Sequence, residues 1–285
     1  FLRGLTKKVI IADNLAPFAD AVFDAPEGGP SVVIWVAALC FYVQIYCDFS
    51  GYSDMAIALA SVFGFTLPAN FAHPYFATNP TVFWRRWHIS LSGWLRDYLY
   101  IPLGGSRQGA LMTARNLMLT MLLGGLWHGA SWNFVLWGAM HGVALVAWRA
   151  IEPVCVRLGA SLGRAARVVA TVASWAAFQY WVLLTWLVFR VADPGLLRIA
   201  LRKFVVPDMQ LGLSGLGLGN MAFFSTLVII AAFAALHVAS WRLRGLDERI
   251  ARAPLPVACA VCVALGVSLY FLWPNGQAAF IYFQF

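Results

Sequence analysis

Long apolar segments constrain the fold of this chain more than any other feature. They run from Ser31 to Phe49, Val168 to Phe189, Met221 to Trp241 and Leu255 to Trp273. Each is close to the roughly 20 residues that an α-helix needs to cross a hydrocarbon core about 30 Å thick. Because lipid offers the backbone no hydrogen-bonding partner, such segments fold as helices. The sequence therefore predicts an all-α polytopic membrane protein.

The composition agrees with this class. Hydrophobic residues make up 61% of the 285 residues and charged residues 11%, whereas a soluble domain carries about 25% charged residues. The net charge of +8 is spread over loops, so it indicates contact with lipid headgroups and not nucleic-acid binding. Without a repeat or a separable soluble segment, we expect one transmembrane domain over residues 1–285. Since the chain begins at Phe1, we expect a fragment that lacks an N-terminal portion.

The distribution of arginine predicts the topology. The segments 149–167 and 241–252 carry four arginines each, and they lie on the same side of the predicted helices. The opposite side holds Arg190, Arg198, Arg202 and Lys203. The positive-inside rule therefore places the first pair of loops in the cytoplasm, and the C-terminal tail outside.

Two acidic residues interrupt the first apolar segment. Asp48 and Asp54 stand in CDFSGYSDM, so we expect the spanning helix to end there and a short helix to resume from Asp54 to Phe65. Helix capping is the favoured role of both carboxylates, and orientation of an active-site group is the alternative. The preceding segment, Phe1 to Phe23, has the pattern of an amphipathic helix at the membrane surface.

A histidine stands in the apolar stretch LLGGLWHGASW, at His128. The flanking segments, Leu111 to Trp127 and Trp132 to Trp148, predict a pair of helices around it. Ionisable groups in such surroundings are functional-site candidates. An apolar site keeps the imidazole neutral, so His128 could act as a general base. The alternative is a histidine that bridges two helices by hydrogen bonds.

A second histidine, His88, occupies a cationic segment, FWRRWHISLSGWLRDYLY. We expect one interfacial or re-entrant helix from Pro80 to Tyr100. Its guanidinium groups could bind phosphate or carboxylate, or they could simply extend to the headgroups of a membrane belt. The residues that would share one face of this helix are Arg85, His88, Ser92 and Arg96.

The cysteines indicate no metal site. Cys259 and Cys262 form a C-x-x-C within the apolar run PVACAVCVALG. Redox and zinc motifs normally lie among polar neighbours, so we expect a buried, inert pair. No nucleotide-binding loop or haem motif is present in the sequence.

Taken together, the two histidine segments indicate a particular protein family. WRRWHISLSGWLRDYLYIPLGG followed by LLGGLWHGASWNFVLWGAMHG resembles the membrane-bound O-acyltransferase family. The resemblance is strongest to the bacterial branch that acetylates alginate and other exported polysaccharides, with teichoic acid D-alanyl transfer more distant. It covers Phe1 to about Trp148 and returns at the C-terminus. It implies further spanning helices before Phe1, and a multi-helix core with re-entrant or interfacial helices around a central channel.

The resemblance implies roles for individual residues. His128 matches the family's buried catalytic histidine, and His88 matches its second polar position in the active site. The family moves an acyl group from a thioester to a hydroxyl, which implies acetyl-coenzyme A or a similar thioester as the donor and no resident cofactor. An anionic donor would explain the basic residues Arg85, Arg86, Arg96, Arg107 and Arg115, and we expect Trp84 and Trp127 to border it.

Two further side chains, those of Tyr282 and His141, are candidates for a role in the site. The tail FIYFQF resembles an aromatic motif of related acyl-export systems, in which a tyrosine carries the acyl group; Tyr282 would be that relay here, or else a membrane anchor. His141 lies thirteen residues after His128. On a continuous helix it would point in roughly the opposite direction, so we expect a packing role, although the resemblance implies that family members also place a histidine there.

The sequence thus predicts a multi-pass acyltransferase of the bacterial inner membrane that serves O-acetylation of an exported polysaccharide such as alginate. Its expected partners are a periplasmic SGNH-type acetyltransferase, the polysaccharide export machinery and membrane lipid. Export of D-alanyl or peptidoglycan acyl groups is an alternative. A transporter or channel with a proton relay through His128 and His88 is another, which predicts inverted repeats that the sequence does not show. A non-catalytic scaffold is the third.

Overall fold

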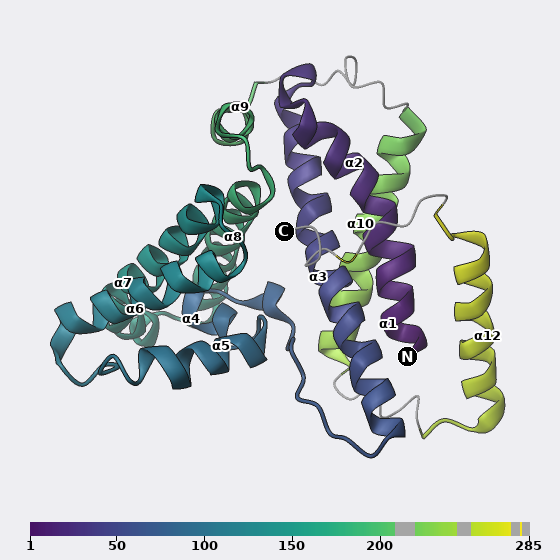
Figure 1. Cartoon of the computed structure of the whole chain (residues 1–285), viewed down its shortest axis with the longest axis horizontal. Helices are drawn as coiled ribbons and strands as arrows, with labels where there is room; N and C mark the ends of the chain where they lie inside the picture. Colours follow the sequence, from purple (N-terminus) through teal and green to yellow (C-terminus); the bar gives the residue numbers. More distant parts are fainter. Residues whose placement is uncertain (209–219, 244–251, 275–279, 281–285) are drawn as a thin grey trace. The chain divides into compact units, whose positions relative to one another are not determined.

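The computed structural model describes residues 1–208, 220–243, 252–274 and 280 (Figure 1). The regular elements in this part of the chain are all helical, which confirms the all-α prediction. Two compact units are present, one formed by Phe1–Pro68 with Arg198–Phe285 and the other by Ala69–Leu197. The single domain over residues 1–285 stays a prediction. The helices long and apolar enough to cross a membrane are Ser31–Val62, Trp132–Ser161, Arg164–Arg190 and Met221–Arg242.

The first unit begins with helical segments that run end to end along a long helix. These segments are α1 (Leu2–Thr6), a π-helical stretch (Lys7–Ala12) and α2 (Asp13–Asp24), and the long helix is α3 (Ser31–Val62). Leu15, Phe18 and Phe23 on α2 are buried. The predicted N-terminal helix is therefore present, with an apolar face that packs within the unit.

Helix α3 is continuous, so the predicted break at CDFSGYSDM is wrong. Lys8 Nζ lies 2.8 Å from Asp13 Oδ1 and 2.5 Å from Asp48 Oδ1. Asp54 binds the Arg3 guanidinium at 2.7 Å and Lys7 Nζ at 2.8 Å. Paired charges can stay inside a packed helix, whereas unpaired ones could not. Helix capping by the two aspartates is therefore also wrong, because both lie inside α3 and bind cations of the N-terminal segment.

The remaining helices of this unit pack on the first ones. α10 (Asn220–Arg242) contacts α2 and α3, and α12 (Leu255–Phe271) contacts α1. These helices lie where apolar spans were predicted, although α12 has only 17 residues. Cys259 and Cys262 are exposed, so their predicted burial is wrong. An apolar helix can expose apolar side chains, and hydropathy does not show which face packs.

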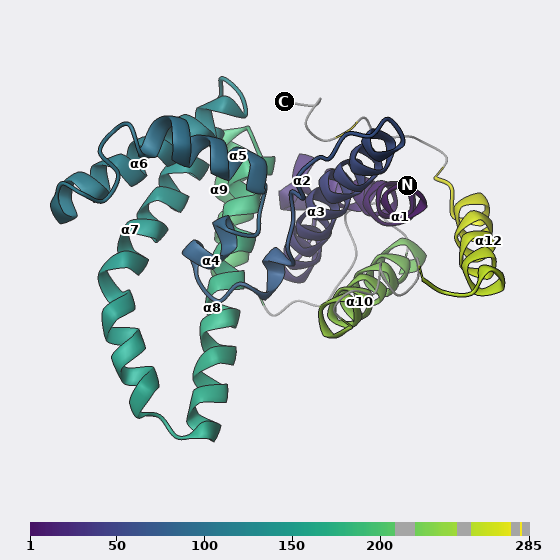
Figure 2. The same cartoon turned by 90° about the horizontal axis from the view of Figure 1, so that it is seen from below.

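The second unit contains the two histidine segments. It comprises a short 3-10 turn (Pro74–Phe76), α4 (Pro80–Trp84), α5 (Ile89–Leu95), a π-helical stretch (Arg96–Tyr100), α6 (Gly109–Trp127), α7 (Trp132–Ser161) and α8 (Arg164–Arg190). Figure 2 shows α7 and α8 as long helices joined by a short turn. The predicted helical pair around His128 is confirmed, and α7 continues beyond Trp148 through Pro153. α9 (Pro194–Val205) leads from this unit into the first.

The expected single helix from Pro80 to Tyr100 is wrong. α4 ends at Trp84, and His88 adopts a left-handed backbone with φ of 43° before α5 begins. Backbone hydrogen bonds with Asn70 and Ala72, which precede α4, stabilise this break. Ile89 N–H donates to the Asn70 carbonyl oxygen at 3.0 Å, and Ala72 N–H donates to the Arg86 carbonyl oxygen at 3.0 Å. These bonds take backbone groups that a continuous helix would have used internally.

Helices α6 and α7 approach each other through glycines. A Cβ atom on Gly125 would meet the carbonyl oxygen of Phe134, and one on Gly138 would meet the carbonyl oxygen of Met121. Small residues at a helix interface let two backbones come close, as is common in membrane proteins. The turn that carries His128 is therefore held by a tight helical hairpin.

Replacement of Gly138 by alanine is expected to destabilise this hairpin by about 1–3 kcal/mol, because the new methyl group has no space. Gly159→Ala is the matched control on the same helix, since a Cβ there would meet nothing within 4 Å. Thermal unfolding of the purified protein in detergent measures both. Equal melting temperatures for the two variants would contradict the proposed close packing.

Candidate active site

The structure brings His88 and His128 to the same indole ring. The ring centroid of Trp127 lies 5.1 Å from that of His128 and 6.3 Å from that of His88. The two histidines come from segments far apart in the sequence, and both lie outside the helices of the described chain that are long and apolar enough to span a membrane. The motifs that the sequence singled out therefore form one cluster, which we call the histidine pair.

His88 is held in place by its neighbours in the chain. A left-handed backbone is uncommon for a residue other than glycine and persists only where surrounding contacts impose it. Here Asn70 supplies those contacts, since its side-chain oxygen also accepts from Ser90 Oγ at 2.6 Å. Ser90 Oγ lies 3.5 Å from His88 Nδ1. The His88 side chain is buried, and burial lowers its pKa to about 4.

His128 is surrounded by aromatic rings. Trp137 of α7 lies 5.2 Å away, Phe189 of α8 5.3 Å and Phe134 of α7 6.3 Å, measured between ring centroids. These three side chains are buried, whereas Trp127 is 58% exposed. Burial, with a smaller contribution from nearby His88, lowers the pKa of His128 to about 3. Both imidazoles are therefore neutral near pH 7.

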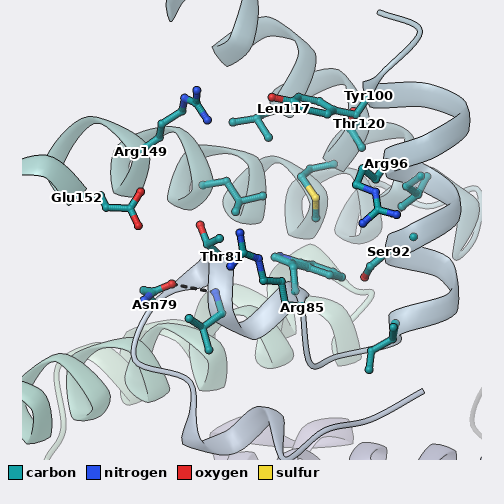
Figure 3. Close-up of a pocket in the computed structure, with 17 residues that line it drawn as sticks. Asn79, Thr81, Arg85, Ser92, Arg96, Tyr100, Leu117, Thr120, Arg149 and Glu152 are labelled. Atoms are coloured by element: carbon teal, nitrogen blue, oxygen red, sulfur yellow. Dashed lines mark hydrogen bonds between the residues drawn. The ribbon is translucent and has the colours of Figure 1, made fainter. Parts of the chain in front are cut away.

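A cavity of about 610 Å³ lies along the same hairpin, between α4, α5, α6 and α7. It is lined by three residues that the sequence predicted to bind the donor, Trp84, Arg85 and Arg96. Figure 3 shows Arg149 and Glu152 on one side, Ser92 and Arg96 on the other, and Arg85 reaching between them. We call this space the cationic cavity.

The arginines of the cationic cavity differ in their pairing. Arg96 Nε donates to Asp97 Oδ1 at 2.7 Å. Arg85 and Arg149 form no salt bridge with any residue that the structure describes. Guanidinium groups without a carboxylate partner are well suited to bind phosphate or carboxylate of a ligand.

Sequence reasoning missed part of this lining. Asn79 accepts from Val82 N–H at 2.9 Å and so caps α4, as its place before a proline could have indicated. Arg149 and Glu152 were assigned to a loop because the helix was expected to end at Trp148. Further lining residues that were missed are Thr81, Tyr100, Leu117 and Thr120.

Other predicted site residues lie elsewhere. Arg86, His88, Trp127 and His128 do not line the cationic cavity. Arg115 is engaged by its own helix, since its guanidinium donates to Asn116 Oδ1 at 2.9 Å. Tyr282 falls outside the residues that the structure describes, so its proposed role is not tested.

The direction expected for His141 assumed one continuous helix from His128, and that assumption is wrong, whereas its expected packing role stays a prediction. Both rings contact the indole of Trp137, at 4.8 Å for His141 and 5.2 Å for His128. The expectation assumed one continuous helix, but the chain leaves the helix at His128 and α7 starts only at Trp132. The turn changes the angular relation between the two histidines.

Comparison with known proteins supplies the family. Residues 1–161 match the MBOAT, membrane-bound O-acyltransferase family. A probable alginate O-acetylase of Azotobacter vinelandii is 56% identical over 154 residues, which cover 53% of this chain and 30% of the relative. A probable alginate O-acetylase of Pseudomonas aeruginosa is 48% identical over 204 residues, covering 72% of this chain and 36% of the relative.

A peptidoglycan O-acetyltransferase of Helicobacter pylori is 35% identical over 305 residues, covering 100% of this chain and 55% of the relative. The chain thus spans between 30% and 55% of the length of these curated relatives. The family match covers more than half of the chain and includes both histidine segments and the whole of α7. The chain therefore belongs to the membrane-bound O-acyltransferase family.

Proposed function

We propose that the protein containing this chain transfers an acetyl group from a thioester to a hydroxyl group, in the O-acetylation of an exported polysaccharide. The observation that carries the proposal is the histidine pair beside a cavity lined by unpaired guanidinium groups. The names of the relatives support it, since they are an alginate O-acetylase and a peptidoglycan O-acetyltransferase.

His128 is the proposed general base. Its neutral ring takes the proton of the acceptor hydroxyl while the oxygen attacks the thioester carbonyl carbon. A new C–O ester bond forms and the C–S bond breaks. The proton passes from the imidazolium to the departing sulfur and gives a free thiol. Because burial keeps the pKa of His128 low, the imidazolium releases this proton readily.

His88 is the proposed second catalytic residue. It lies across the Trp127 ring from His128 and is held by the Asn70 contacts. Its ring is suited to hydrogen-bond the acceptor hydroxyl or the carbonyl oxygen that gains charge in the transition state. The exposed indole of Trp127 borders the approach to both rings.

The cationic cavity is the proposed site for the anionic part of the donor. Acetyl-coenzyme A carries phosphates, which Arg85, Arg96 and Arg149 could bind. We propose no resident cofactor or metal. Arg149 belongs to the segment that the positive-inside rule places toward the cytoplasm, so we propose that the donor enters from there.

The proposal extends to the acceptor polymer, the location of the protein and its partners. The acceptor polymer is alginate or a similar exported glycan, and the protein lies in the inner membrane as a multi-pass component. A periplasmic SGNH-type acetyltransferase would place the group on the polymer, beside the export machinery. Tyr282 is the proposed first acceptor, which would carry the acyl group on the outer side.

Replacement of His128 by alanine is expected to lower acyl transfer by about 10²- to 10⁴-fold, the usual contribution of a general base. The measurement is acetyl content of the polymer in cells, together with the amount of the protein in the membrane. His237→Ala is a control, because His237 is another buried histidine and lies on α10. Normal acetylation with His128→Ala would favour a scaffold and contradict the proposed chemistry.

The pH dependence of transfer is a second test. With pKa values of about 4 for His88 and about 3 for His128, both rings stay neutral as the pH falls from 8 to 5. The catalytic rate constant should be flat over this range and decrease only as the pH approaches 4, where His88 gains a proton. A decrease with a midpoint near the ordinary imidazole value of about 6.5, in protein that tryptophan fluorescence shows to be folded, would contradict it.

Asn70→Ala tests the placement of His88. Loss of the side-chain oxygen frees Ser90 and loosens the turn, which is expected to lower kcat on the order of tenfold to a hundredfold. The KM of the donor should change little, because Asn70 does not line the cationic cavity. A raised KM with unchanged kcat would show that Asn70 acts on donor binding and not on His88.

A further inference from the structure

His141 is a polar side chain enclosed in an aromatic box. It is 0% exposed, and its ring lies 6.0 Å from Phe83, 5.1 Å from Trp84 and 4.8 Å from Trp137. Neither ring nitrogen has a hydrogen-bonding partner among the residues that the structure describes. A buried polar group without a partner costs free energy and calls for an explanation.

The two indoles beside His141 share this property. Nε1 of Trp84 and Nε1 of Trp137 are buried and have no partner in the described part of the chain. An indole N–H is a donor only, while a neutral imidazole offers one donor and one acceptor. Three adjacent rings therefore present donors together with one acceptor.

These groups lie between the cationic cavity and His128. Trp137, His141, Leu145 and Arg149 recur at every fourth position, so they form one stripe along α7. Leu145 and Arg149 line the cavity, and Trp137 contacts His128. The twelve positions from Trp137 to Arg149 correspond to a rise of roughly 18 Å. Trp84, whose ring contacts both His141 and Trp137, also lines the cavity.

We propose that His141, with the indole N–H groups of Trp84 and Trp137, hydrogen-bonds an amide in the arm that carries the acyl thioester. This rests on the proposed function and narrows the donor to a thioester on an amide-bearing arm with an anionic end, as in coenzyme A. The amide carbonyl accepts from an indole N–H, and the amide N–H donates to the imidazole. An arm with its anionic end at Arg149 and its thioester at His128 would leave the cavity beside Trp84, the one of the three rings that lines it, and would then run past the enclosed rings of His141 and Trp137.

The test compares two donors that share one acetyl thioester. N,S-diacetylcysteamine carries an amide, and S-ethyl thioacetate does not. For the full-length protein in detergent, kcat/KM is expected to favour the amide-bearing donor by about tenfold or more, because a site built around hydrogen bonds rejects an analogue that leaves them unmade. His141→Phe keeps an aromatic ring without nitrogens and should reduce this preference to near one.

Matched variants separate recognition from folding. Trp84→Phe should reduce the preference in part, and His141→Gln, which retains a donor and an acceptor, should restore much of it. Trp181→Phe, on α8, is the control. It also removes a buried indole N–H that has no partner among the described residues. The described structure records no contact between the Trp181 ring and His141. The rate with S-ethyl thioacetate reports whether each variant is folded and active.

The inference is overturned if His141→Phe still prefers the amide-bearing donor as strongly as the wild-type protein does. It is also overturned if the wild-type protein does not distinguish the two donors. In either case ordered water would supply the hydrogen bonds of the three rings. Should His141→Phe lose activity with both donors, the preference of Trp84→Phe decides, and a wild-type value there overturns the inference. A wild-type protein that uses neither thioester, nor acetyl-coenzyme A, contradicts the proposed function and the inference with it. The failure of the inference alone is therefore distinguishable.

Discussion

The close packing of α6 against α7 is the constraint on which the candidate site depends. Gly125 and Gly138 let the two backbones meet, and a Cβ atom at either position would meet a carbonyl oxygen of the other helix. This hairpin carries His128 at its turn and holds the cavity-lining residues of both helices further along. Backbone contact leaves no side chain that could adjust, so the positions of the turn and of the cavity are coupled.

Charges in this apolar chain serve two different purposes. In the first unit, Lys8 pairs with Asp13 and Asp48, and Asp54 pairs with Arg3 and Lys7, so opposite charges join the N-terminal segment to α3. In the second unit, Arg85 and Arg149 have no salt bridge with a described residue and face a cavity. Asp13 and Asp48 are buried, and their charges would be costly without the Lys8 ammonium. Arg85 and Arg149 are exposed, so their charges carry no such cost, and without a carboxylate partner their guanidinium groups can bind an anionic ligand.

The polar groups around the histidines also differ in whether the chain itself supplies their hydrogen-bonding partners. His88 obtains its contacts from the chain itself, through Asn70 and Ser90. His141 and the indoles of Trp84 and Trp137 do not obtain theirs from any described residue. The first set determines a conformation, and the second set is the one that we propose to bind the donor. The sequence alone does not separate the two sets, because tryptophan is common at membrane interfaces whether or not it binds a ligand.

The amino-acid sequence by itself determined the helical membrane class, the hairpin around His128 and the family, because hydropathy, helix periodicity and short motifs are local properties. Only the tertiary structure decided which groups meet. The break at His88 depends on hydrogen bonds from Asn70, and the continuity of α3 depends on cations of the N-terminal segment. The shared contact of His128 and His141 with Trp137 depends on a turn between two helices. Contacts between distant segments select among conformations that local preferences leave close in free energy.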